Sequence, residues 1–232
     1  MMKIIGWALG LSILYMGNFA LAGQLEDILL QGIRDDNLTL VQSALKQGAN
    51  PNFEYRFTGS NNTVWYSMAL IEATTQVAPL SIKNRLRIIS ALIEAGADSN
   101  IQTQYHADQH SIPSESQSWG YSALMGAANN GFIEAAKILI ANGAKLNLVT
   151  QGVCPVSAVW LSSYTGRPIT TEVLIESGAD FNFRGGCFNE TPLTKAKEGI
   201  RKVLTSKTSM EWGETINYSE TFRVLLGAGA HE

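Results

Sequence analysis

The sequence predicts an all-α protein built as a stack of about five helix-turn-helix units. Three observations predict it: a central helix that is apolar on almost every side, a helix-ending pattern that recurs five times, and an asparagine that follows four of those helix ends. A helix that is apolar all around must be covered on both sides, which one helix pair cannot achieve alone. The central unit therefore needs neighbours of its own kind.

The central unit spans residues 120–147 and predicts two short helices. The first is expected from about Ser122, and its small or apolar residues allow close approach to neighbouring helices. A tight turn follows at Asn130-Gly131, because glycine adopts the left-handed conformation that a sharp reversal needs. The second helix is expected from Phe132 to about Asn142, and Gly143 ends it.

The helix-ending pattern recurs along the whole chain. A leucine, a glycine three or four residues later and an alanine directly after it occur at Leu45–Gly48–Ala49, Leu92–Gly96–Ala97, Leu139–Gly143–Ala144, Leu174–Gly178–Ala179 and Leu225–Gly229–Ala230. An asparagine stands four residues after the first four of these glycines, at Asn52, Asn100, Asn147 and Asn182. Five concordant helix ends indicate internal repeats rather than chance.

With these motifs the chain resembles an ankyrin-repeat protein, a family with a unit of about 33 residues that contains a hairpin-like turn and two helices. Thr191-Pro192-Leu193 matches the family's opening of a first helix; Ser122-Ala123-Leu124 and Cys154-Pro155-Val156 occupy the same place in two other units. The resemblance covers about Leu25 to His231. It implies one solenoid domain over residues 23–232, with units at about 24–52, 66–100, 120–147, 152–182 and 189–232.

Residues 1–22 are predicted to be a secretory signal peptide. Lys3 supplies the positive start, an apolar run follows, and Ala20-Leu21-Ala22 fits a cleavage site that would leave Gly23 first. A transmembrane anchor is the alternative, but glycines interrupt the run and small residues end it. The signal suits a Gram-negative bacterium, so we expect a periplasmic or secreted protein with no membrane anchor after cleavage.

The charge balance argues against nucleic acid as a partner. Without Lys3, the 17 basic residues become 16 against 20 acidic ones, a net charge of −4. Basic residues gather only modestly, around 195–202. The two cysteines, Cys154 and Cys187, would enter a compartment in which disulfides persist. They fall near the starts of adjacent units, so a bridge between them is expected, with two buried thiols as the alternative.

Two connections are longer than the family implies. The intervals between the helix-ending glycines are 48, 47, 35 and 51 residues. The turn before Tyr66 is about eight residues longer than usual and the turn before Gly120 about fourteen longer. We name residues 53–65 the first finger and residues 101–119 the second finger. In the family such hairpin-like loops project along the concave side.

Both fingers combine polar turn residues with aromatic ones, and aromatic and Arg side chains dominate binding hot spots. The candidate partner-binding residues are Tyr55, Arg56, Phe57, Trp65, Tyr105, His106, His110 and Trp119. Trp65 and Trp119 adjoin helix starts, so filling gaps between units is the favoured interpretation for these two, with partner contact as the alternative. For Tyr55, Arg56, Phe57 and Tyr105, contact with a partner is the favoured interpretation.

Catalytic residues and cofactors are not predicted. No Gly-x-Ser-x-Gly nucleophile motif, phosphate-binding glycine loop or Cys-x-x-Cys occurs. His106 and His110, with Asp108 and Glu115 nearby, are the closest approach to a metal site, but their stretch lacks a helical pattern. A metal-dependent enzyme that uses this pair remains the alternative from another functional class.

The expected function is a scaffold that binds one protein partner. Its most concrete form is an immunity protein that neutralises a toxin in the bacterial envelope, such as a secreted phospholipase, with the fingers at the entrance of the toxin's cleft. The toxin is inferred from analogy with exported ankyrin proteins. The alternatives are an accessory protein of a periplasmic oxidative-stress enzyme such as a catalase, and release from the cell to bind a host protein.

Overall fold

The structure is a computed structural model that describes residues 21–58, 64–75, 81–104, 120–205 and 216–232. Its elements, in chain order, are α1 (Leu21–Arg34), α2 (Leu38–Lys46), β1 (Glu54–Thr58), β2 (Val64–Met68), α3 (Ala69–Thr75), α4 (Ile82–Glu94), α5 (Ala123–Asn130), α6 (Ile133–Ala141), α7 (Ala158–Tyr164), α8 (Pro168–Glu176), α9 (Pro192–Thr205) and α10 (Tyr218–Gly227). Most of the predicted signal peptide lies outside the described residues. Helix α1 begins two residues before Gly23, the predicted first residue of the exported chain.

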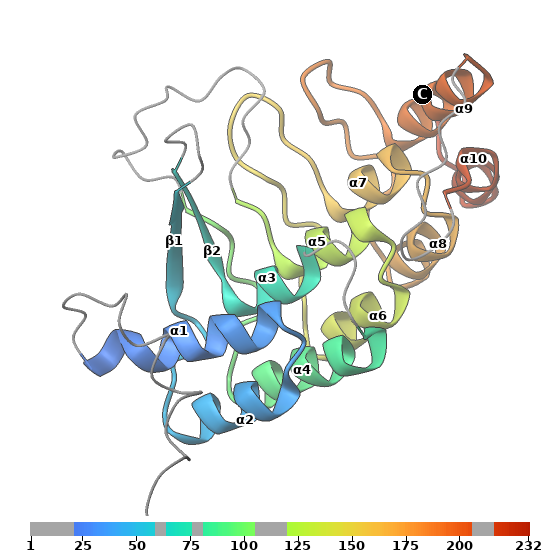
Figure 1. Ribbon diagram of the computed structural model, residues 1–232. Coiled ribbons are helices and arrows are strands. Elements are labelled where there is room, and N and C mark those ends of the chain that lie inside the picture. The colour runs from blue at the N-terminus through green and yellow to red at the C-terminus, as the bar shows by residue number, and fades with distance from the viewer. Residues whose placement is uncertain (1–20, 59–63, 76–80, 105–119, 206–215) are drawn as a thin grey trace, which may run out of the picture.

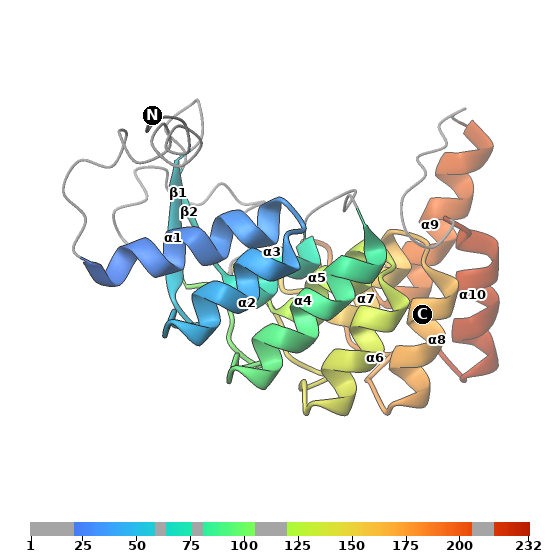
Figure 2. The ribbon, with the colours of Figure 1, turned by 60° about the horizontal axis from the view of Figure 1, so that its bottom comes forward.

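The helices form two parallel rows. The first helices of successive pairs contact one another in the order α1, α3, α5, α7 and α9, and the second helices do so in the order α2, α4, α6, α8 and α10. Figure 2 shows the second row side by side from the blue to the red end of the chain. Each pair is therefore covered by the pairs beside it, as the apolar central helix requires.

The central pair follows the sequence prediction within a residue or two. Helix α5 starts after Ser122, whose hydroxyl accepts a hydrogen bond from the backbone N–H of Met125, and it ends at Gly131 with φ 67°. Helices α3 and α5 approach each other closely at Gly126, because a Cβ added to this glycine would lie 2.6 Å from Thr74 Oγ1 of α3. Small residues on the first helix let the neighbouring helix backbones approach.

The recurring glycines end the second helices by one shared geometry. Gly48, Gly96, Gly143, Gly178 and Gly229 all have positive φ, between 81° and 98°. The alanine after each glycine donates its backbone N–H to a carbonyl five residues earlier, on Ala44, Leu92, Leu139, Leu174 and Leu225. This is a Schellman cap, and it requires a residue that tolerates the left-handed conformation.

The first pair departs from the expected pattern in register. The carbonyl that caps α2 belongs to Ala44, which is fully buried, whereas Leu45 is only partly buried. In the other pairs a fully buried leucine stands at this place. Leu45 lies three residues before Gly48 instead of four, and that shift rotates its side chain about 100° around the helix.

The all-α prediction is wrong at the first finger. Strands β1 and β2 pair antiparallel, with Tyr55 opposite Ser67 and Phe57 opposite Trp65. The fold is otherwise mostly helical, and α9 extends to Thr205 as a lengthened first helix. Alternating residues of a strand face opposite sides, so the pairing decides which side chains of the finger are buried.

The recurring asparagines join successive pairs. Asn52 accepts a hydrogen bond from the Asp98 N–H at 2.8 Å, and Asn100 accepts one from the Lys145 N–H at 2.7 Å. Asn52 and Asn100 also donate through Nδ2 to the carbonyls of Gly96 and Gly143. Asn147 and Asn182 accept the equivalent bonds from the N–H groups of Asp180 and His231. Each asparagine therefore bonds the backbone of the next helix end.

We expect Asn100→Ala to lower the free energy of unfolding by about 1–2 kcal/mol, because it removes two hydrogen bonds of about 1 kcal/mol each between neighbouring pairs. Asn142→Ala is the matched control, since Asn142 Nδ2 bonds only within its own helix end, to Ile138 O. Urea unfolding followed by circular dichroism measures both variants. Equal stability of the Asn100 variant and the wild type would contradict the role given to these asparagines.

Candidate interaction surface

Three connections project, in the described part of the chain, from the side of the first-helix row. Figure 1 shows β1 and β2 and the connections before α7 and α9 extending in the same direction. We name residues 148–157 the third finger and residues 183–191 the fourth finger. Isolated bridges close the base of the second, third and fourth fingers, between Gln102 and Ser122, Val149 and Ser157, and Gly185 and Glu190. Each of these bridges fixes the base of one finger beside the start of a first helix.

The first finger turns one face onto α1. Tyr55 is 3% exposed, and its hydroxyl donates to the carbonyl of Glu26 at 2.9 Å. Burial raises the pKa of the Tyr55 hydroxyl, and the negative charge of Glu26 raises it to a smaller extent. The prediction that Tyr55 contacts a partner is therefore wrong: its ring packs inside the first unit. Phe57 lies on the same face, partly buried, with the Arg34 guanidinium carbon 4.6 Å from its ring centre.

Arg56 lies on the opposite face of the hairpin and is exposed. Its cross-strand neighbour is Tyr66, which is partly buried. Because strand side chains alternate, the face that turns away from α1 carries Arg56 rather than Tyr55 or Phe57. Arg56 therefore stays a candidate for partner contact. The side chain of Trp65 lies outside the described residues.

We expect Tyr55→Phe to lower the free energy of unfolding by about 1 kcal/mol, because it removes one buried hydrogen bond and leaves the packing in place. Tyr164→Phe is a suitable control, since the Tyr164 side chain is 45% exposed. Its change should stay within about 0.5 kcal/mol. Chemical unfolding of the two variants in parallel measures the difference, and an unchanged Tyr55 variant would show that the hydroxyl contributes nothing.

The second finger is described only at its base. Gln102 Nε2 donates to the carbonyl of Gly120 and, at 2.9 Å, to that of Val149, which ties this finger to the third one. The candidates Tyr105, His106, His110 and Trp119 lie outside the described residues. Among the residues that are described, no three His, Cys, Asp or Glu side chains come together as metal ligands would.

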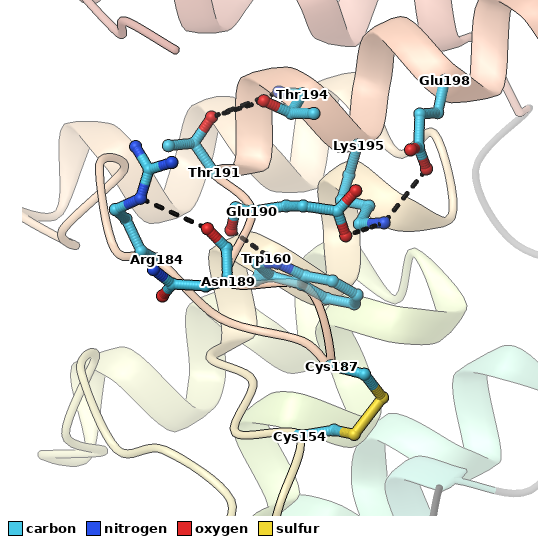
Figure 3. A network of polar contacts seen from close by, with 10 residues as sticks. All are labelled: Cys154, Trp160, Arg184, Cys187, Asn189, Glu190, Thr191, Thr194, Lys195 and Glu198. Carbon is cyan, nitrogen blue, oxygen red and sulfur yellow. Dashed lines mark hydrogen bonds and ion pairs between the residues drawn. A yellow bond between two sulfur atoms is a disulfide. The ribbon is translucent and has the colours of Figure 1, made fainter.

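A disulfide joins the third and fourth fingers. Cys154 and Cys187, 33 positions apart, are bonded, as the sequence predicted, and Figure 3 shows the bridge between the two loops. The backbone adds a second link, since the Gly186 N–H donates to the Pro155 carbonyl at 2.7 Å. The two tips are therefore held side by side.

Each joined tip exposes one large apolar side chain. Phe188 is 82% exposed and Val153 is 68% exposed, and they directly follow or precede the bonded cysteines. Both values are high for apolar residues on a folded surface, and Tyr164 of α7 is also exposed. Large apolar side chains exposed on a fixed support are a common feature of protein-binding surfaces.

A partly buried polar network joins the fourth finger to α7 and α9. Lys195 of α9 forms ion pairs with Glu190 and, at 3.0 Å, with Glu198 (Figure 3). Burial alone would lower the pKa of Lys195, but the hydrogen bonds to these two carboxylates raise it above its ordinary value. Trp160 of α7 lies against the same lysine and donates its indole N–H to the Glu190 carbonyl at 3.1 Å.

The sequence reasoning missed this pair of tips. It placed the contact residues in the two longest connections, whereas Val153 and Phe188 lie in shorter ones. The available signal was the segment Gly185-Gly186-Cys187-Phe188-Asn189, in which a large aromatic residue stands among turn-forming ones. A phenylalanine inside a tight turn can seldom reach a core, so its position alone points to the surface.

Comparisons with known proteins agree with the fold. The family model of the ankyrin repeat matches residues 119–151, which contain α5 and α6. A curated relative, the ankyrin repeat and KH domain-containing protein mask-1 of Caenorhabditis elegans, is 28% identical over 132 residues, which is 54% of this chain and 5% of that protein. Both similarities support an ankyrin-repeat protein. The chain covers only a small part of the relative's length.

The described helices also bear on membrane insertion. None of them combines the length and the apolar composition needed to cross a lipid bilayer.

Proposed function

We propose that this chain is an exported scaffold that binds one specific protein partner through its fingers. The observation that carries the proposal is the pair of disulfide-joined tips with Phe188 82% and Val153 68% exposed. Ankyrin repeats are modules that bind proteins, and insertions in repeat arrays commonly map to the binding face. Arg56 of the first finger provides a second contact point on the same side.

Export is the first part of the proposal. Residues 1–22 have the features of a signal peptide, and a disulfide persists in an oxidising compartment such as the periplasm. We expect the protein recovered from the periplasm of the producing bacterium to begin at Gly23, which intact-mass measurement would detect. A mature chain that keeps residues 1–22, or one found only in the cytoplasm, would contradict this.

The specific role that we propose is neutralisation of a toxin in the cell envelope, such as a secreted phospholipase. In this role the rigid tips occupy the entrance of the toxin's cleft and exclude its substrate. Shape and a few large anchors are enough for tight binding of this kind, because preformed loops lose little conformational entropy on association. The scaffold contributes contact surface and no catalytic group.

Affinity purification tests both levels of this proposal. The tagged mature protein is used to recover partners from the periplasmic fraction, and the hydrolytic activity of any stoichiometric partner is measured with and without added scaffold. The proposal expects one partner whose activity falls on addition. A partner whose activity rises, such as a catalase, would replace the neutralising role by an accessory one. Recovery of no specific partner would contradict the scaffold itself.

A further inference from the structure

The joined tips of the third and fourth fingers differ in charge from the rest of the molecule. The whole chain has a formal net charge of −3. Residues 151–155 and 184–189, which form the two tips, contain no acidic residue, and their one charged residue is Arg184. The tips therefore present apolar side chains together with a single positive charge.

Arg184 is available to an external carboxylate. Its Nε donates to the carbonyl of Asn189 at 3.2 Å, which orients the guanidinium beside the turn (Figure 3). The side chain is exposed, and within the described part of the chain no carboxylate lies within ion-pair distance of it. Lys195 is not available to an external carboxylate in this way, because it forms ion pairs with Glu190 and Glu198 and its side chain is only 9% exposed.

The turn that carries Phe188 is fixed from several directions. The backbones of Gly185 and Glu190 exchange two hydrogen bonds, at 2.9 and 2.7 Å, and the disulfide holds Cys187. Trp160 packs directly beneath, since a Cβ on Gly186 would lie 2.6 Å from its ring. Phe188 is therefore presented outward on a rigid base, an arrangement that reduces the entropy lost on binding.

We propose that the joined tips recognise a protein surface with an apolar pocket bordered by a carboxylate. Phe188 and Val153 enter the pocket, and Arg184 pairs with the carboxylate. The inference rests on the proposed scaffold function and specifies the chemistry of its partner. A second copy of this chain fits less well, because two identical tips would oppose arginine to arginine without a carboxylate.

A display selection tests this chemistry without the natural partner. The mature wild-type protein is used to select from a library of random linear peptides on phage, and the affinity of each enriched peptide is then measured for the wild type and for the variants. We expect enriched peptides that combine large apolar residues with Asp or Glu. Their affinity should fall about 30-fold on Phe188→Ser and about 10-fold on Arg184→Glu, as for central hot-spot residues.

Two exposed residues of α4 provide matched controls. Ile82→Ser removes an apolar side chain that is 61% exposed, and Lys83→Glu reverses an exposed charge, so both should change affinity less than about twofold. Thermal unfolding of every variant checks that the fold is kept. Reduced binding that is confined to the tip variants supports the proposal.

Other outcomes overturn it. Peptides that bind Phe188→Ser and the wild type with equal affinity would show that Phe188 does not contact them. Enriched peptides without acidic residues, or a selection that enriches none, would also contradict binding of an apolar and acidic surface by the tips. Peptides that lose affinity only on Arg56→Ala would keep the scaffold function and move its site to the first finger. Concentration-dependent dimers that Phe188→Ser abolishes would identify a second copy as the occupant instead.

Discussion

Replacing both cysteines, in the double variant Cys154→Ser/Cys187→Ser, is expected to lower the free energy of unfolding by about 3–4 kcal/mol. The bridge closes a loop between positions 33 residues apart, and the chain-entropy treatment assigns a constraint of that size to such a loop in the unfolded chain. The loss should be local, because units of a repeat stack depend mainly on their neighbours. Amide hydrogen exchange should therefore accelerate in α7–α10 far more than in α1–α4.

The same double variant provides its own control for reduction. Dithiothreitol should destabilise the wild type by a comparable amount and leave the variant unchanged. Binding of a partner should weaken as well, since the tips that present Val153 and Phe188 lose their covalent link. Unchanged stability and unchanged exchange in the variant would show that backbone contacts alone hold the two fingers.

Replacing Arg85 by methionine is expected to cost about 3–5 kcal/mol, the range observed when one partner of a buried ion pair is removed. Arg85 Nη2, on α4, lies 2.6 Å from Asp36 Oδ1, and the two side chains are 2% and 3% exposed. Asp36 occupies the turn between α1 and α2 with φ 50°, so the pair joins the first two helix pairs. Arg85→Met leaves the buried carboxylate without its charged partner.

A second substitution separates charge from packing. Asp36→Asn keeps a residue type that tolerates positive φ, so Arg85→Met/Asp36→Asn should recover part of the lost stability. Lys137→Ala is the surface control, because Lys137 and Glu134 form an ion pair with side chains 51% and 61% exposed; removing it should cost less than about 0.5 kcal/mol. Equal losses in the Arg85 single and double variants would contradict a charge-based cost.

The helix ends and the unit pattern were predictable because they depend on local chemistry. A leucine with a Gly-Ala pair four residues later, as at Leu139–Gly143–Ala144, marks the end of a helix, because this glycine adopts the positive φ that the helix cap requires. The pairing of Cys154 with Cys187 followed from the likeness of adjacent units. Leu45 shows the limit of such pattern matching, since a one-residue shift places Ala44 in the core instead.

The candidate site was harder to predict because it depends on which face each residue takes. The sequence predicts a hairpin-like loop at the first finger but not its strand register, so it groups Tyr55 with Arg56 although their side chains point to opposite faces. Only the register of β1 against β2 separates them. Exposure of Phe188 likewise depends on a disulfide and a turn that join two distant segments.

Site-specific photo-crosslinking in the producing cell tests the central claim most directly. A benzophenone amino acid is placed at position 188 on the fourth finger, and at positions 82 and 226, whose natural residues are 61% and 49% exposed on helices of the second row. We predict one specific protein adduct from position 188 and none from the two helix positions. Adducts from positions 82 or 226, with none from position 188, would contradict binding through the fingers.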